Sequence, residues 1–149
     1  MRKFEKIIGS NATLPQRSTT GSAGYDIKTY EEVTIPPMGI AYVSTGLKVK
    51  LPKGEYLQLS ARSSLFKKYH CIVPALGIID EDYYNNQDNE GHFKIVLWNI
   101  STTQSVVIPK GERVAQGIFL KYYTTDDDEP ISTIRTGGFG STDVKGENK

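Results

Sequence analysis

Apolar and polar residues alternate along much of the chain with a period of two. The pattern is clearest at 47–51, where three apolar residues are separated by Lys48 and Lys50. Successive side chains of a β-strand point to opposite faces, so this alternation predicts a strand with one buried face and a solvent-facing lysine side. The same period predicts further short strands at 33–35, 57–61, 93–97, 106–108 and 114–120. In the last strand, the positions predicted to share one face are Val114, Gln116, Ile118 and Leu120.

Tight turns separate several of these segments. Each of the triplets at 37–39, 52–54 and 109–111 begins with a proline and ends with a glycine, which is typical of a tight turn. The pattern predicts one short helix, from Arg62 to His70, whose first turn is capped by Ser63 or Ser64. Many short strands and a single short helix predict an all-β fold.

The chain divides into a β domain, 1–130, and a glycine-rich C-terminal arm, 131–149, which belongs to the same single domain. The polar run NNQDNEG at 85–91 predicts an extended hairpin loop. The acidic run at 124–130 predicts a solvated linker, with metal binding as the alternative. The arm is too rich in glycine and charge to form a core, so we expect it to be flexible until it contacts something else.

Composition limits the classes of function. The 149 residues include 18 basic and 17 acidic residues and one cysteine, Cys71. A net charge of +1 argues against a surface that coats nucleic acid, so we expect no direct nucleic-acid partner and only a small anionic ligand. The lone cysteine excludes an internal disulfide, and no apolar run is long enough to span a membrane. We therefore expect a cytoplasmic or nuclear protein with no membrane partner.

Two groups of residues suit an anionic ligand. Arg62, Ser63 and Ser64 offer a guanidinium and two hydroxyls at a predicted helix start, which suits a phosphate, although a helix cap beside a surface arginine is the simpler interpretation. In the arm, the glycines let the backbone approach an anion and Arg135, Ser141 and Thr142 supply donors, while a flexible tail is the alternative. Phe139 has no strand around it, which indicates that it packs on a partner.

Asp80 is the candidate general base. It follows two isoleucines and precedes Glu81 and Asp82, so its carboxylate can point away from those of its neighbours; an acidic strand end is the alternative. Tyr83 can stack on a sugar or pack within the hairpin, and the spacing does not decide between the two. His70 and His92 lack ligand spacing for zinc, and no GxSxG nucleophile motif occurs.

Five segments in this order resemble the five motifs of trimeric dUTPases, the deoxyuridine triphosphate nucleotidohydrolases. The resemblance covers 23–142, nearly the whole chain, in the segments AGYD (23–26), RSS (62–64), GIIDEDY (77–83), GERVAQ (111–116) and GGFGST (137–142). It implies a jelly-roll-like β-barrel or sandwich of the β-clip type and a homotrimer whose active sites are shared between chains. It further implies Mg²⁺-dependent hydrolysis of dUTP to dUMP and pyrophosphate by attack of water on the α-phosphorus, which limits uracil incorporation into DNA.

The resemblance also implies roles for individual residues. Asp80 would orient the attacking water, and the ring of Tyr83 would pack on the deoxyribose and exclude a ribose hydroxyl. Asp26 would hold a water bound to Mg²⁺. The other residues implied to contact the substrate are Arg62, Ser63, Ser64 and Gln116 at the phosphates, Ala75, Gly77 and Ile79 in the uracil hairpin, and Arg135, Phe139, Gly140, Ser141 and Thr142 in the arm.

The sequence departs from the family pattern in several places, among them Ala61 for the usual proline and Asp143 for the usual final glycine. Pro74 has no N–H, so a uracil carbonyl must be bound by another residue such as Ala75. Arg135 lies four residues before Phe139 where the family usually has five, and 85–91 lengthens a hairpin that usually turns directly through glycine.

Two other functions are compatible with the same fold. A dCTP deaminase would need a catalytic glutamate after the hairpin, where this chain reads KIVLW at 94–98. A nucleotide sensor or protein-binding regulator without catalytic activity would account for the altered arm and the longer hairpin.

Overall fold

A computed structural model of the chain describes residues 1–135 and 137–138. The predicted contacts of Phe139, Gly140, Ser141 and Thr142 therefore fall outside the described residues. The elements, in chain order, are β1 (Lys3–Lys6), β2 (Gln16–Arg17), β3 (Tyr25–Lys28), β4 (Val33–Ile35), β5 (Ile40–Ser44), β6 (Leu47–Lys50), β7 (Glu55–Ala61), α1 (Ser63–Tyr69), β8 (Cys71–Ile72), β9 (Gly77–Ile79), the 3-10 helix η1 (Glu81–Tyr83), β10 (Lys94–Asn99), β11 (Val106–Ile108) and β12 (Arg113–Lys121). Neither helix of this described part is long and apolar enough to span a membrane.

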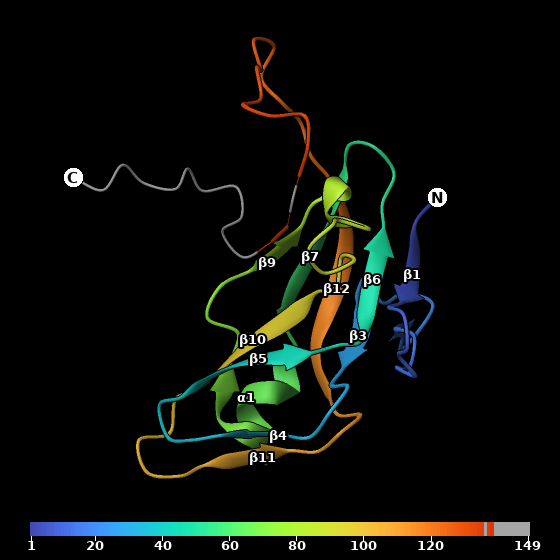
Figure 1. The fold of residues 1–149 in the computed structure, drawn as a ribbon. Helices are drawn as coiled ribbons and strands as arrows, with labels where there is room; N and C mark the ends of the chain where they lie inside the picture. Colours follow the sequence, from blue (N-terminus) through green and yellow to red (C-terminus); the bar gives the residue numbers. More distant parts are fainter. Residues whose placement is uncertain (136, 139–149) are drawn as a thin grey trace, which may run out of the picture.

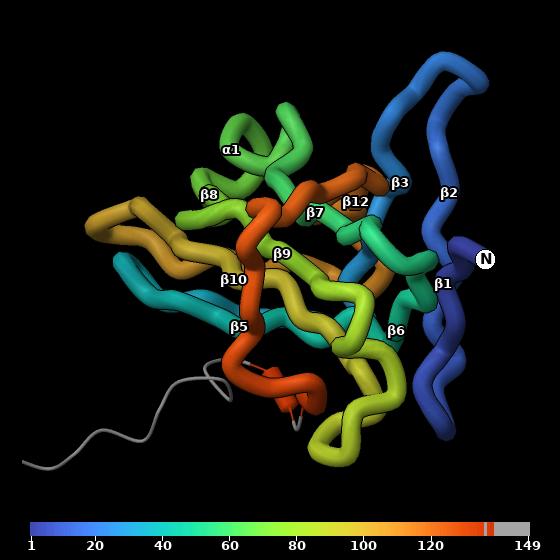
Figure 2. The backbone as a smooth tube through the Cα atoms, turned by 90° about the horizontal axis from the view of Figure 1, so that it is seen from above, coloured from blue at the N-terminus to red at the C-terminus, as the bar shows by residue number. Residues whose placement is uncertain are grey.

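The strands form two main antiparallel sheets. The larger sheet has the order β2-β3-β12-β7-β9, the smaller has the order β5-β10-β8, and β1-β6 and β11-β4 form separate pairs. Figure 1 shows β5 and β10 running across the direction of β7 and β12, and Figure 2 shows the two sheets as layers. The predicted all-β, jelly-roll-like sandwich is confirmed.

The core lies between these two layers. The larger sheet contributes Ile27, Leu57, Leu59 and Ala115, and the smaller contributes Val43, Ile95 and Leu97, all 3% exposed or less. Such side chains are each worth about 1.5–3 kcal/mol when removed from water. Packing of the two sheets holds together segments that are far apart in the sequence. The loops that connect the strands are thereby anchored at both ends.

The prediction of which residues of β12 share the buried face is wrong. Leu120 is 36% exposed, whereas Ala115 is fully buried and Gly117 faces Leu57. The register of β12 against β3 shifts between Arg113 and Ala115, and such a bulge leaves Val114 and Ala115 both buried. As a result, Gln116 faces away from the core.

Lys48 also differs from the prediction that both lysines of this strand face solvent. It is 9% exposed, and its ammonium Nζ donates to Asn85 Oδ1 and Glu90 Oε1, both at 2.7 Å. The predicted serine cap of the helix is wrong as well, because Arg62 occupies the N-cap position and no side chain caps the helix. The helix itself is confirmed, and it is anchored by the buried Leu65.

Candidate active site

The residues predicted to bind a ligand gather in two cavities. The first, of about 280 Å³, we call the apolar pocket; it is lined by Leu59, Phe93, Ile95 and Ala115 and by the predicted site residues Ala75, Gly77, Ile79, Asp80, Tyr83 and Arg135. The second, of about 330 Å³, we call the polar pocket; it is lined by Ser18, Ser22, Ala23 and Gly24 and by the predicted Asp26, Arg62, Ser63 and Gln116. Ser64 lines neither pocket and instead accepts a hydrogen bond from Arg62 Nη1 at 3.3 Å.

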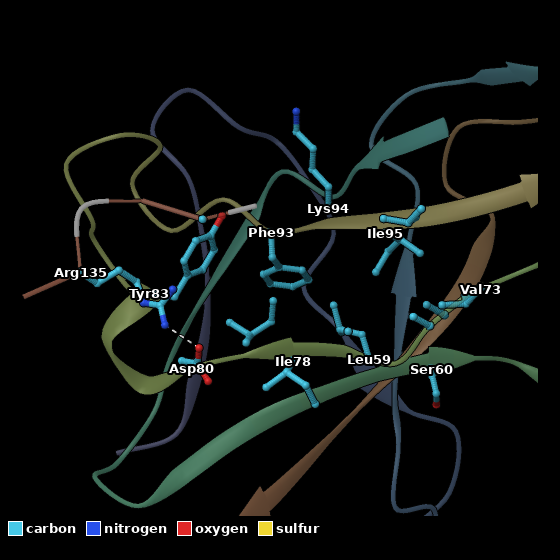
Figure 3. A pocket seen from close by; sticks show the side chains of 16 residues that line it. Leu59, Ser60, Val73, Ile78, Asp80, Tyr83, Phe93, Lys94, Ile95 and Arg135 are labelled. Atoms are coloured by element: carbon cyan, nitrogen blue, oxygen red, sulfur yellow. Dashed lines mark hydrogen bonds and ion pairs between the residues drawn. The ribbon is translucent and has the colours of Figure 1, made fainter. Parts of the chain in front are cut away.

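Strand β9 forms one wall of the apolar pocket. It pairs with β7 so that Gly77 lies opposite Leu59. A Cβ atom added at Gly77 would lie 3.0 Å from the Leu59 Cβ, so any larger residue would press on that wall. Asp80 directly follows the strand in an extended conformation and is followed by η1, and half of its side chain is exposed. The backbone therefore presents this carboxylate at the mouth of the pocket (Figure 3).

Tyr83, at the end of η1, lines the same pocket from the other side. The residue is 6% exposed, and its hydroxyl donates to the His92 carbonyl at 3.1 Å and accepts from Asn89 Nδ2 at 2.7 Å. Gly138 lies so close that an added Cβ would be 2.5 Å from the ring. The beginning of the C-terminal arm thus contacts Tyr83, and only glycine fits at that position.

Arg135 brings a positive charge to Asp80. Its Nη2 lies 2.5 Å from Asp80 Oδ2 and its Nε 2.5 Å from Asp82 Oδ1. The guanidinium is 16% exposed, whereas both carboxylates are about half exposed. In the structure Arg135 thus binds the candidate base, whereas its predicted contact with the substrate is untested.

The polar pocket centres on Asp26. Asp26 and Gln116 are direct cross-strand partners in β3 and β12. The Asp26 carboxylate accepts from Ser18 Oγ at 2.9 Å and pairs with Arg62 Nε at 2.8 Å and Arg113 Nη1 at 3.2 Å. One carboxylate, two guanidinium groups and several hydroxyls make a site suited to a phosphate chain.

Gly24 leaves the space that the side chain of Gln116 occupies in the polar pocket. A Cβ atom added there would lie 2.5 Å from Gln116 Oε1. The amide of Gln116 donates from Nε2 to the Ala61 carbonyl at 3.3 Å, while its Oε1 packs close to Gly24. Gly24, Ser18 and Arg113 were not predicted as site residues, although Gly24 lies within the AGYD segment and Arg113 within the GERVAQ segment.

The two pockets open on opposite faces of the larger sheet. Ala115 lines the apolar pocket and the next residue of β12, Gln116, lines the polar pocket. Adjacent residues of a strand point to opposite faces. Figure 3 shows the side chains of Leu59 and Ser60 leaving β7 on opposite sides, although both residues line the apolar pocket. The sheet therefore separates a ligand in the apolar pocket from the polar pocket of the same chain.

Comparison with known proteins shows the family of the chain. The family model described as dUTPase matches residues 10–143. The chain belongs to the dUTPase family. The deoxyuridine 5'-triphosphate nucleotidohydrolase of Lactococcus lactis is 46% identical over 147 residues, covering 95% of this chain and 97% of that protein.

Solved structures show the same likeness. The crystal structure of dUTPase from Streptococcus mutans has a TM-score of 0.79 and 40% identity, and the match covers 83% of this chain and 98% of that one. A mutant dUTPase of phage phi11 of S. aureus has a TM-score of 0.73, covers 89% of this chain and 98% of its own, and at 21% identity shares the fold alone. Its structure is described as showing the coordination of a structural Mg(II) ion.

We expect a histidine next to the apolar pocket to make the stability of this dUTPase family member depend on pH. His92 Nε2 accepts a hydrogen bond from the Gly46 N–H at 3.0 Å. Burial lowers the pKa of His92, and the nearby Lys94 lowers it further, against the opposing effect of Glu90. The folded state thus favours neutral His92, so its stabilising contribution is complete above the unfolded pKa near 6.5 and is lost as the pH falls below that value.

We therefore expect the melting temperature to fall as the pH drops below about 6.5, and the fall to be smaller in His92→Gln. The carboxylates whose pKa is lowered, such as Glu90, gain their protons only at pH values below the ordinary range of a carboxyl group. Thermal unfolding at several pH values measures the effect, with His70→Gln as the matched control. An equal pH dependence in wild type and His92→Gln would contradict this role of His92.

Proposed function

We propose that the chain hydrolyses dUTP to dUMP and pyrophosphate. The observation that carries the proposal is that ten of the eleven described residues expected from the dUTPase motifs line one of the two pockets, Ser64 being the exception. The relatives named deoxyuridine 5'-triphosphate nucleotidohydrolase, which match over most of their length, support the same substrate.

The apolar pocket suits the nucleoside. The exposed backbone around Ala75 in the loop between β8 and β9 offers hydrogen-bonding groups to the uracil edge, with Gly77 and Ile79 forming the wall. Tyr83 presents its ring to the deoxyribose, and a 2′-hydroxyl would find no room and no polar partner against that ring. Discrimination against UTP then follows from the shape of the pocket.

Asp80 would act as the general base. Its carboxylate stands at the pocket mouth, where it can orient a water and accept its proton as the water attacks the α-phosphorus. The bond from that phosphorus to the bridging oxygen breaks, and pyrophosphate leaves. Because water attacks directly, no covalent intermediate with the protein forms.

The phosphates require the polar pocket of another copy of the chain. Asp26, Arg62, Ser63 and Gln116 suit a triphosphate, yet the sheet separates them from the apolar pocket of their own chain. A closed homo-oligomer brings the polar pocket of one copy to the apolar pocket of the next. We propose the homotrimer that the family resemblance implies.

We propose that Mg²⁺ assists the reaction. No group of three or more histidine, cysteine, aspartate or glutamate side chains that could hold a metal occurs in residues 1–135 and 137–138. The carboxylate of Asp26 is an oxygen donor, which suits Mg²⁺, an ion that keeps several waters and binds chiefly through substrate phosphates. Asp26 would hold one of those waters, and the bound ion would neutralise charge on the phosphates.

A nucleotide panel tests the proposed function. We expect dUTP to yield dUMP and pyrophosphate, with UTP, dTTP and dCTP turned over at least about a hundredfold more slowly. Activity should disappear with EDTA and return with excess Mg²⁺. Comparable turnover of UTP would contradict the role of Tyr83, ammonia release from dCTP would indicate a deaminase, and tight dUTP binding without turnover would indicate a sensor.

A further inference from the structure

The loop at 85–91 is the part of the chain that the dUTPase motifs leave unexplained. This loop, predicted to lengthen the hairpin after Tyr83, is compact, and its side chains form a closed set of hydrogen bonds around the buried Asn86. Asn86 Oδ1 accepts from the backbone N–H groups of Asp88 and Asn89 at 3.0 and 3.1 Å. Its Nδ2 donates to the Tyr83 carbonyl and to Asn89 Oδ1, both at 2.8 Å. The loop is therefore folded back onto Tyr83.

Asn89 is the residue of this loop that reaches the hydroxyl of Tyr83. Its Nδ2 donates to Tyr83 Oη at 2.7 Å and to the His92 carbonyl at 3.3 Å. Its Oδ1 accepts from Asn86 Nδ2 and from the Gly91 N–H at 3.1 Å. Each end of the amide has partners of the matching kind, so its orientation is fixed.

The hydroxyl of Tyr83 is held by the chain itself. It donates its only proton to the His92 carbonyl and accepts from Asn89. It therefore has no proton left to donate to a ligand in the apolar pocket. The two hydrogen bonds instead fix where the ring stands.

The loop is attached to the body of the protein, which gives Asn89 a firm support. The buried Lys48 of β6 binds both Asn85 and Glu90, and the Glu90 carboxylate also accepts from the Ile8 N–H at 3.1 Å. A side chain that is held in one position by such surrounding contacts can define a pocket to within a few tenths of an ångström.

We propose that Asn89 is a positioning residue that sets the sugar specificity of the apolar pocket by locking the ring of Tyr83. The inference rests on the proposed function. Without the amide, the buried hydroxyl loses a partner and the ring is free to shift away from the sugar. Because a ribose is excluded by that ring alone, a small shift admits the 2′-hydroxyl while deoxyribose still binds.

The test is a double-mutant cycle of Asn89→Ala and Tyr83→Phe, read out as the ratio of kcat/KM for dUTP to that for UTP. A lost hydrogen bond of this kind corresponds to about a tenfold change. We expect the ratio to fall about tenfold in each single variant and no further in the double variant. Gln87→Ala, at an exposed position of the same loop, is the matched control and should keep the wild-type ratio.

Stability serves as the second measurement. Asn89→Ala also removes the bonds to Asn86 and Gly91, so it should lower the melting temperature even in the Tyr83→Phe background, where it no longer changes the ratio. If Asn89→Ala does not fold, Asn89→Ser keeps a hydrogen-bonding oxygen in the turn but is too short to reach Tyr83.

The outcomes separate the two proposals. An active wild type whose dUTP/UTP ratio is unchanged in Asn89→Ala and Asn89→Ser overturns the role of Asn89 alone. Additive effects of Asn89→Ala and Tyr83→Phe on the ratio overturn it too, since Asn89 would then not act through the hydroxyl. A folded wild type that releases no pyrophosphate from dUTP overturns the proposed function and, with it, this inference.

Discussion

Asp80→Asn is expected to lower kcat for dUTP hydrolysis by about a thousandfold. An amide cannot accept the proton of the attacking water, and general-base catalysis is worth about 10²–10⁴ in rate. The substitution preserves shape, and the pocket walls at Gly77 and Tyr83 do not depend on the carboxylate. Pyrophosphate release measures the rate, and titration with a non-hydrolysable dUTP analogue should show that binding is retained.

Asp82→Asn is the matched control for that experiment. Asp82 lies two residues away, is equally exposed and binds the same guanidinium of Arg135 at the same distance. An exposed ion pair contributes up to about 1 kcal/mol, so this variant should lose no more than about fivefold. Equal losses in the two variants would show that the ion pair with Arg135 matters and that Asp80 is not the base.

Local alternation was enough to predict half of the strands in the described part of the chain. The predicted strands at 33–35, 57–61, 93–97 and 106–108 all match observed strands, because each has one face on the core. β1, β2, β3, β5, β8 and β9 were not predicted, since most are only two to four residues long and lack a clear alternation. The inward face of β12 was assigned incorrectly because a bulge changes the phase of the alternation, and single-sequence periodicity does not detect a bulge.

The candidate site depends even more on pairings and contacts that the sequence pattern does not predict. The motif residues of the two pockets could be named from the resemblance, but their division between opposite faces depends on the cross-strand pairing of Asp26 with Gln116. Lys48 and Asn89 were missed because their partners are distant in sequence or lie in a folded loop. A polar run such as 85–91 predicts a loop, whereas its hydrogen bonds depend on how the backbone turns.

Mixing two inactive variants is expected to restore activity. Arg62→Ala removes a guanidinium from the polar pocket and should lower activity by about a hundredfold or more, because a donor aimed at developing charge is worth that much. Asp80→Asn disables the apolar pocket. If each active site combines the apolar pocket of one copy with the polar pocket of the next, a mixed oligomer contains sites with Asp80 and Arg62 both intact.

The size of the recovery decides whether the pockets are shared. With equal amounts and random assembly, half of the apolar pockets are intact and half of their neighbouring polar pockets are intact, so about a quarter of the wild-type activity should return. Asp80→Asn mixed with the double variant Asp80→Asn/Arg62→Ala is the control and should show no recovery, because every apolar pocket then lacks Asp80. No recovery with Arg62→Ala, in oligomers shown to have mixed, would place all catalytic contacts within one chain and contradict the separation of the pockets by the sheet.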